Sequence, residues 1–141
     1  MLQPTNPFRT SALIENAIKK YKKDNFDSLI SVLPVPKEYN PHWVFEENDK
    51  GFLTIATGDI EIIPRRQDLP KAYIRDGSIY LTSAEVILKS KTFYGKLLGF
   101  LEASDKIHVN IDTLEDWNRA ESLLKLNFCL IGKIITMNFK I

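Results

Sequence analysis

The sequence predicts an α/β fold with a mainly parallel sheet, and three observations support this prediction. Strand-like and helix-like segments alternate along the 141 residues, with a hairpin inserted between them. The helical segments repeat apolar residues every three to four positions, whereas the strand segments are short apolar runs. A chain of this length is also long enough to bury the core of one domain.

The first expected element is a helix over residues 11–23, preceded by a loop that contains two prolines. Thr10 or Ser11 can cap its first turn. Its apolar positions recur at i, i+3, i+4 and i+7, namely Ile14, Ala17, Ile18 and Tyr21. Residues 27–35, DSLISVLPV, then form a buried strand that ends in prolines.

An inserted hairpin is expected next, over about residues 34–64, with its turn at NDKG, residues 48–51. The segment carries four rings, Tyr39, Trp43, Phe45 and Phe52. A two-stranded ribbon cannot bury so many rings by itself. We therefore expect this hairpin arm to pack against a second copy of the chain, with Trp43 in or near the contact of a homodimer.

Two strands and a helix are expected in the following part. GSIYLT, residues 77–82, reads as a strand, and TSAE beginning at Thr82 has capping-box spacing for a helix through Leu88. KIHVNID, residues 106–112, reads as another strand.

Thr113 and Asp116 then open a last helix. Its expected apolar face carries Leu114, Trp117, Ala120 and Leu124. Residues 125–141 form an atypical tail with β-branched, strand-like character. This tail either pairs with an edge strand or has no role.

Composition and charge exclude several classes of protein. The net charge is +1 and the charged residues are scattered, which argues against a nucleic-acid or membrane partner. Cys129 is the single cysteine, so we expect no internal disulfide and a reducing, cytoplasmic location. The apolar run near the C-terminus is short and broken by Lys133, so the sequence predicts no transmembrane span there. His42 and His108 lack partner residues at zinc-ligand spacing.

Three polar segments are expected beyond the carboxyl ends of the strands, where open α/β sheets bind ligands. They are LQPTNPFRT at residues 2–10, RRQDLP at 65–70 and NIDT at 110–113. Each alone has a structural interpretation, as a turn, a solvated loop and a helix cap. Oxygen ligands suit Mg²⁺, so Asp112 is the natural carboxylate for a metal there.

In this order, the segments resemble the CMP-N-acylneuraminate synthetases, also called acylneuraminate cytidylyltransferases. The resemblance runs from Leu2 to about Leu124 and rests on LQPTNPFRT, NPHW, RRQDLP, GSIY, FYG and NIDTLEDW. The family usually reads LQPTSPLRT, RRQDLP, NGAIY and DIDTPEDL. The resemblance implies a Rossmann-like nucleotidyltransferase fold with the hairpin as a dimerisation arm. It also implies transfer of CMP from CTP to an acidic nine-carbon sugar, with Mg²⁺ and release of pyrophosphate.

The chain is similar to the C-terminal part of that family, so residues 1–141 are expected to form one partial, N-terminally truncated domain. Family members begin with a strand and a basic, glycine-containing loop that holds the nucleotide phosphates. Here all six glycines lie at Gly51 or later, and no phosphate-loop pattern occurs. We expect the chain to be inactive alone at this length. A self-sufficient small α/β domain is the alternative.

The resemblance also assigns roles to individual residues. Gln3 would hydrogen-bond the sugar, and Arg66, with Gln67 beside it, would pair with the sugar carboxylate, reaching the neighbouring subunit's site in the dimer. Three rings would wall the sugar and its N-acyl group: Tyr80, Phe93 and Tyr94. The structural interpretation makes Tyr80 and Phe93 ordinary core residues.

The chain departs from the family pattern at the metal site and in NGAIY. Asp112 matches the second aspartate of D-I-D, but Asn110 stands at the first and offers only a neutral oxygen. Asp76 and Ser78 replace the asparagine and alanine of NGAIY. Both departures bear on how firmly metal and sugar are held.

Two alternatives to a sialic-acid cytidylyltransferase remain open from the sequence. One is a non-catalytic oligomerisation partner that keeps the arm and the sugar-side pocket. The other is a cytidylyltransferase for a different acidic sugar, such as a deoxyoctulosonate, pseudaminate or legionaminate.

Overall fold

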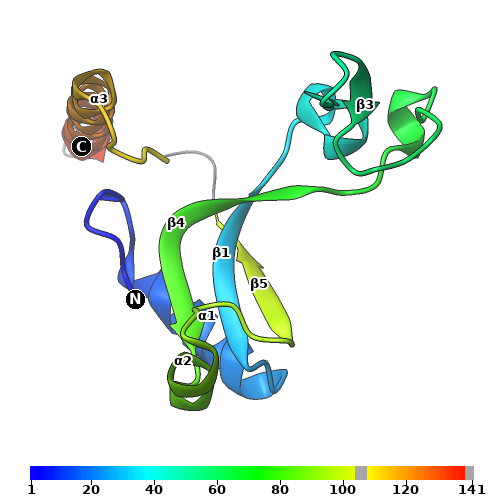
Figure 1. The fold of residues 1–141 in the computed structure, drawn as a ribbon. Helices are drawn as coiled ribbons and strands as arrows, with labels where there is room; N and C mark the ends of the chain where they lie inside the picture. The colour runs from blue at the N-terminus through cyan, green and yellow to red at the C-terminus, as the bar shows by residue number, and fades with distance from the viewer. Residues whose placement is uncertain (104–107, 139–141) are drawn as a thin grey trace.

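A three-stranded sheet forms the centre of the protein in the computed structural model, which describes residues 1–103 and 108–138 (Figure 1). Its order is β4-β1-β5, with β1 at Ser28–Pro34, β4 at Tyr73–Thr82 and β5 at Leu98–Glu102. β1 is antiparallel to β4 and parallel to β5. The α/β class is confirmed and is compatible with a Rossmann-like fold, but the sheet is mixed and not mainly parallel in the described part.

Helix α1, Ser11–Lys23, packs on this sheet with the boundaries that the sequence predicts. Thr10 is the N-cap, since its hydroxyl accepts a hydrogen bond from the Leu13 amide at 3.2 Å. Ala17, Leu29 and Ile79 form the fully buried core between the helix and strands β1 and β4. The small side chain of Ala17 lets the helix approach the sheet closely.

The pairing of β1 with β4 contains a bulge that shapes the site described below. Ile30 pairs with Tyr80, but Val32 already pairs with Arg75, so the β4 residues between these two partners have no regular register. Ser31 on β1 holds the bulge, because its hydroxyl accepts from the Ile79 amide at 2.7 Å and donates to the carboxylate of Asp76.

The inserted hairpin is confirmed and projects away from the sheet (Figure 1). β2, Phe45–Glu47, and β3, Leu53–Ile55, pair antiparallel around the predicted turn. Short 3₁₀ turns flank them: η1 at Lys37–Tyr39, η2 at Pro41–Trp43 and η3 at Arg66–Asp68. Trp43 is half-buried within the arm, where its indole N–H donates to the Ile63 carbonyl at 2.7 Å.

Helix α2, Ala84–Ser90, begins one residue later than predicted and also ends later. Ser83, not Thr82, is the N-cap, since its hydroxyl accepts from the Val86 amide at 3.2 Å. Thr82 is still part of β4, and its hydroxyl donates to the Phe93 carbonyl at 2.8 Å. Because the first helical residue is Ala84, the capping position falls on Ser83 and not on Thr82.

The strand predicted at residues 106–112 is wrong where the structure describes it, because residues 108–112 belong to no strand. Residues 106 and 107 lie outside the described part. The parallel partner of β1 is instead β5, which the sequence did not indicate. Gly99 of β5 is buried, and a Cβ there would lie 2.2 Å from the Phe26 ring, so glycine is needed for this packing.

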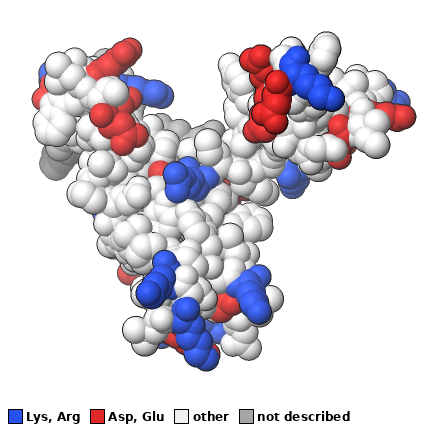
Figure 2. Space-filling model, in the orientation of Figure 1, with Lys and Arg blue, Asp and Glu red and all other residues white. Residues whose placement is uncertain are grey.

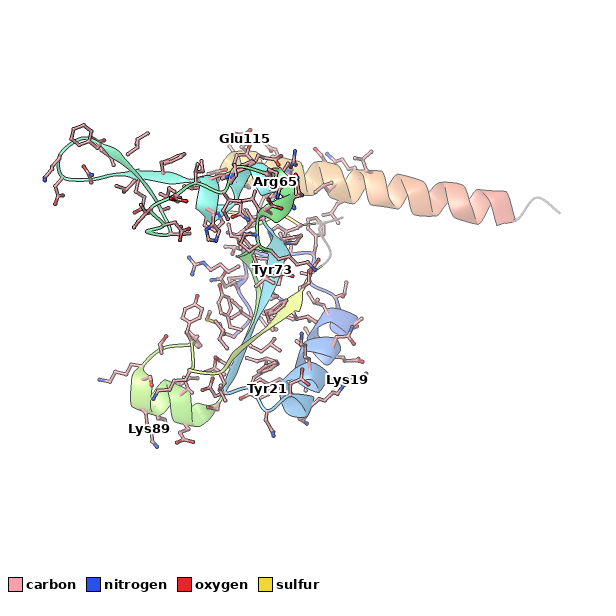
Figure 3. The ribbon with its side chains drawn as sticks, turned by 90° about the vertical axis from the view of Figure 1, so that its right-hand side faces the viewer. Lys19, Tyr21, Arg65, Tyr73, Lys89 and Glu115 are labelled. Atoms are coloured by element: carbon pink, nitrogen blue, oxygen red, sulfur yellow. The ribbon has the colours of Figure 1, made fainter. Side chains whose placement is uncertain are left out.

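Helix α3, Leu114–Asn138, continues through the segment predicted as a strand-like tail (Figures 1 and 3). Its start is as predicted: the Thr113 hydroxyl accepts from the Asp116 amide at 3.2 Å, and Asp116 accepts from the Thr113 amide at 2.9 Å. Hydrogen bonds that the Thr113 hydroxyl and the Asp112 and Thr113 amides donate to its carboxylate lower the pKa of Asp116. Propensity for β structure is a weak signal, and no proline stops the helix after residue 125. Residues 139–141 lie outside the described part.

Charges of both signs are spread over the face drawn in Figure 2, as the sequence predicts. Among the described residues, no helix is both long enough and apolar enough to cross a bilayer.

Candidate active site

A polar pocket of about 450 Å³ lies beside the β4 bulge, and we call it the bulge pocket. Three segments distant in sequence line it: residues 3–5, residues 75–77 with Tyr80, and a third group of His108, Asn110 and Asp112. Four residues that the resemblance singles out therefore share one pocket, namely Gln3, Tyr80, Asn110 and Asp112.

Hydrogen bonds fasten these three segments together. The Ile111 amide donates to the Thr5 carbonyl at 2.8 Å, which joins the first segment to the third. Arg9 joins the first segment to β4, because one of its nitrogens lies 3.0 Å from the Gln3 carbonyl and 3.0 Å from the Ser78 carbonyl. The opening LQPT segment is thus a wall of the pocket.

Gly77 allows the Gln3 side chain to lie against the β4 backbone. Its φ is +79°, in the left-handed region that favours glycine, and a Cβ there would lie 2.6 Å from Oε1 of Gln3. Gln3 is the residue to which the resemblance gives a hydrogen bond with the sugar. The glycine at this position therefore fixes where that amide sits.

We expect Gly77→Ala to displace Gln3 and to cost about 1–2 kcal/mol of folding stability through backbone strain. Gly58→Ala is a suitable control, since Gly58 also has positive φ, at +80°, but nothing lies within 4 Å of its Cβ position. Urea denaturation and a sugar-binding titration measure the two effects. Equal loss of sugar binding in both variants would contradict the steric role of Gly77.

Asn110 and Asp112 are hydrogen-bonded to each other just before the N-terminus of helix α3. Nδ2 of Asn110 donates to Oδ2 of Asp112 at 2.5 Å, while the Thr5 hydroxyl donates to Oδ1 of Asn110 at 2.9 Å. The two side chains face the same way, as expected for residues i and i+2 of an extended segment. Asn110 thereby holds the carboxylate of Asp112 in a fixed orientation.

The side chains of Asn110 and Asp112 fit Mg²⁺ only as a site with two protein oxygens. Among the described residues, no group of three or more histidine, cysteine, aspartate or glutamate side chains could hold a metal ion. Mg²⁺, however, is commonly held by one or two protein oxygens, with the rest supplied by phosphates and water. Oδ1 of Asp112 can supply one such oxygen, and Oδ1 of Asn110 has a second lone pair beyond the hydrogen bond from Thr5.

The aromatic residues gather behind one wall of the pocket. The Tyr80 ring lies 6.4 Å from Phe93 and 6.4 Å from Tyr94, measured between ring centroids, and it meets Tyr94 edge-on. Tyr80 is buried, and burial raises the pKa of its hydroxyl. Phe93 and Tyr94 are exposed and do not line the pocket themselves. Each lies against Tyr80, which does line it.

Arg66 and Gln67 do not line the bulge pocket. Arg66 lies at η3, where the arm returns to the sheet, and its Nη2 atom forms an ion pair with Oε2 of Glu38 at 3.0 Å. Gln67 lines a second cavity of about 440 Å³ between the arm and the start of β4. Figure 3 labels Arg65 and Tyr73 on either side of this connection. Within one chain, the RRQDLP segment follows the arm directly and lies outside the bulge pocket.

Three ionisable residues that were not among the predicted site residues also line the pocket: Arg75, Asp76 and His108. Asp76 is buried, and its carboxylate accepts from Ser31 and from the amide and hydroxyl of Ser78, at 3.0 and 2.8 Å for Ser78. Nδ1 of His108 lies 3.4 Å from Nδ2, the side-chain amide nitrogen, of Asn6. Gly77 was a usable signal, since an isolated glycine in a strand pattern suggests a bulge.

The fold and the pocket define an α/β chain with a polar, carboxylate-bearing site of the kind that binds a small polar ligand. The comparisons with curated proteins confirm the more particular resemblance, to the cytidylyltransferases of acidic sugars. The chain is 32% identical over 134 residues to a CMP-N,N'-diacetyllegionaminic acid synthase of Legionella pneumophila, aligned over 90% of this chain and 53% of that protein.

Two further relatives agree with this resemblance. An N-acylneuraminate cytidylyltransferase of Streptococcus agalactiae is 28% identical over 117 residues, which cover 83% of this chain and 28% of that protein. A post-translational flagellin modification protein B of Campylobacter coli is 26% identical over 125 residues, covering 88% and 51%. The chain thus spans about half the length of the first relative and less of the second. No protein-family model matches the chain.

Proposed function

We propose that the chain is a cytidylyltransferase polypeptide that transfers CMP from CTP to an N-acylneuraminate-type acidic sugar, with release of pyrophosphate. The observation that carries the proposal is the bulge pocket, in which Gln3, Tyr80, Asn110 and Asp112 converge. The names of the relatives in Legionella and Streptococcus support the reaction class.

The proposed chemistry is attack of a sugar hydroxyl on the α-phosphorus of CTP, with pyrophosphate leaving. Negative charge gathers on the phosphate, so positioning and electrostatic stabilisation carry most of the catalysis. Asp112, oriented by Asn110, and Asn110 itself would hold the magnesium ion. The ion would offset the phosphate charge. Gln3 and the Tyr80 wall would orient the sugar.

The test is pyrophosphate release from CTP with magnesium and a panel of acidic sugars, by the chain alone, which we expect to be inactive, and by the chain joined to the part of the Legionella relative that it does not cover. The panel contains N-acetylneuraminate and N,N'-diacetyllegionaminate, because the relatives' names carry both types of sugar. Deoxyoctulosonate and pseudaminate complete it as the remaining acidic sugars. Sugar-dependent release above the rate with CTP alone supports the proposal. Titrations of the chain with CTP and with each acid of the panel complete the test, and the absence of binding to all of them would overturn the proposal.

A non-catalytic oligomerisation partner is the second candidate, and the exposed arm favours it. Among the described residues, the arm presents large apolar side chains to solvent, including Tyr39, Phe52, Leu53, Ile60 and Ile62. This candidate predicts a stable dimer that binds the sugar acid without releasing pyrophosphate. The same assay, together with a sugar-binding titration, separates it from the first.

We propose that the arm, residues 34–64, forms a homodimer interface. Ile60 is 100% exposed and Leu53 is 70% exposed, and both line an apolar groove with Phe45 and Ile62. Trp43 packs inside the arm, so a Trp43 substitution would disturb the arm itself and test the interface poorly.

Ile60→Asp is expected to convert the dimer to a monomer at micromolar concentration, because it places a charge in the contact. Light scattering measures the change. Leu88→Asp is the control, since Leu88 is 79% exposed on α2, outside the arm. A monomeric wild type, or a dimer that resists Ile60→Asp and Leu53→Asp alike, contradicts the interface.

A further inference from the structure

We infer that Arg75 of this chain binds the carboxylate of the acidic sugar, a role that the resemblance gives to Arg66. The inference rests on the proposed function, since it concerns the sugar of that reaction. It follows from the position of Arg75, from what holds its side chain and from the charges around it.

Arg75 is the only lysine or arginine that lines the bulge pocket in the described part of the chain. It lies where β4 enters the bulge, next to Asp76 and Gly77, and it is exposed. Within the described part of one chain, an anionic group that enters this pocket therefore meets the guanidinium of Arg75 as its nearby fixed positive charge.

Tyr94 holds the guanidinium in place. Nη1 of Arg75 donates to the Tyr94 hydroxyl at 3.2 Å, and this hydrogen bond raises the pKa of Arg75, so the group stays charged. The Tyr94 ring is in turn packed edge-on against Tyr80. A guanidinium has five N–H donors, so a hydrogen bond to one phenol leaves four N–H groups free. Two of these can donate to the two oxygens of one carboxylate, the bidentate geometry that arginine favours.

The carboxylates close to Arg75 do not neutralise it. No ion pair among the described residues involves Arg75. The carboxylate of Asp76 accepts from Ser31 and Ser78, and that of Asp112 accepts from Asn110. By contrast, Arg66 is already paired with Glu38. Among the described residues, the pocket thus contains one charged arginine that forms no ion pair with the carboxylates of Asp76 and Asp112 beside it.

The neighbours of Arg75 favour the sugar carboxylate over a phosphate as its ligand. Arg75 is attached to the aromatic wall through Tyr94 and Tyr80, and a ring face suits the apolar side of a sugar and its acyl group. Phosphate groups suit the other wall, where the oxygens of Asp112 and Asn110 can share a magnesium ion.

Titrations of the full chain with an acidic sugar and with its methyl ester test this role, with CTP titrated separately. N-acetylneuraminate and its methyl ester differ only in the charge that Arg75 would bind. We expect the wild type to bind the acid at least about tenfold more tightly than the ester. In Arg75→Gln this preference should fall to about twofold or less, with CTP affinity changed by less than about twofold.

Two matched variants sharpen the result. Arg75→Lys keeps the positive charge but cannot form the two parallel hydrogen bonds of a guanidinium. Its preference for the acid over the ester should lie between those of the wild type and Arg75→Gln. Lys89→Gln removes one positive charge from α2, outside the pocket, and should behave as the wild type (Figure 3). Melting temperatures of all variants show whether each remains folded.

The outcomes separate this inference from the proposed function. Binding of CTP with an acid preference that survives Arg75→Gln overturns the role of Arg75 and leaves the proposed function standing. Loss of CTP binding in Arg75→Gln, with the acid preference intact, also overturns it, because Arg75 then serves a phosphate. A wild type that binds neither CTP nor any acid of the panel overturns the proposed function itself.

Discussion

In the chain restored with an N-terminal part of the family, Asp112→Ala is expected to lower magnesium-dependent cytidylyl transfer by about a hundredfold or more. A carboxylate about 4 Å from a divalent ion attracts it by roughly 8 kcal/mol at an effective dielectric of about 20, before desolvation is subtracted. Asp112 is the only carboxylate of the third pocket segment, residues 108–112. Titration of magnesium against pyrophosphate release measures the loss.

Asn110→Asp is the informative partner of this variant. Asn110 now donates a hydrogen bond to Asp112, so an aspartate would place two like charges in contact. We expect a lower melting temperature without magnesium, recovery of stability when magnesium is added and tighter metal binding. If Asp112 served only as a residue beside the helix cap, neither variant would change the magnesium dependence. Such a result would contradict the metal role.

Asp76→Ala is expected to destabilise the fold by about 3 kcal/mol, the largest stability effect among our predictions. Asp76 is 4% exposed, and its carboxylate accepts from Ser31 on β1 and from Ser78 on β4. Removing it leaves the Ser78 amide and hydroxyl without this acceptor inside the bulge, while the Ser31 hydroxyl keeps only the Ile79 carbonyl, at 3.3 Å. Chemical denaturation monitored by tryptophan fluorescence measures the change in the free energy of unfolding.

The same contacts explain the departure from NGAIY as a coupled change. The hydroxyl of Ser78 donates to Oδ2 of Asp76 at 2.8 Å, so the serine satisfies the oxygen that an asparagine would not present. Asp76→Asn and Ser78→Ala should each destabilise the chain by about 1–2 kcal/mol. The double variant, which restores the family residues, should cost less than the sum by about 1 kcal/mol or more. Strict additivity would show that the two positions are independent.

The sequence predicted best those elements whose cause is local. Helix α1 and the start of α3 are set by Thr10 and by the Thr113–Asp116 pair, whose capping hydrogen bonds form within one turn. The hairpin follows from its turn residues. By contrast, β5 depends on Gly99 meeting the ring of Phe26, which is distant in sequence. No local pattern reports such a contact.

The candidate site divides in the same way. Gln3, Asn110 and Asp112 were found because short motifs carry them, and the structure places them in one pocket. Arg75 was not assigned to the site, because its importance depends on a pocket that forms only when three segments meet. Arg66 lies just after the arm and outside the bulge pocket of its own chain, so its predicted contact with sugar requires a second subunit, which stays a prediction.

The central position of β1 also determines when this protein can fold during synthesis. Leu29 pairs with Leu81 on one side and with Gly99 on the other, and the ribosome makes both partners only after the entire arm. Until then the buried strand Ser28–Pro34 has two open edges, while helix α1 has no sheet to cover. Contacts so distant in sequence slow folding, because long loops must close before any pairing stabilises them. Until both partner strands are made, the nascent chain exposes an apolar strand with two unpaired edges, which favours pairing with other chains.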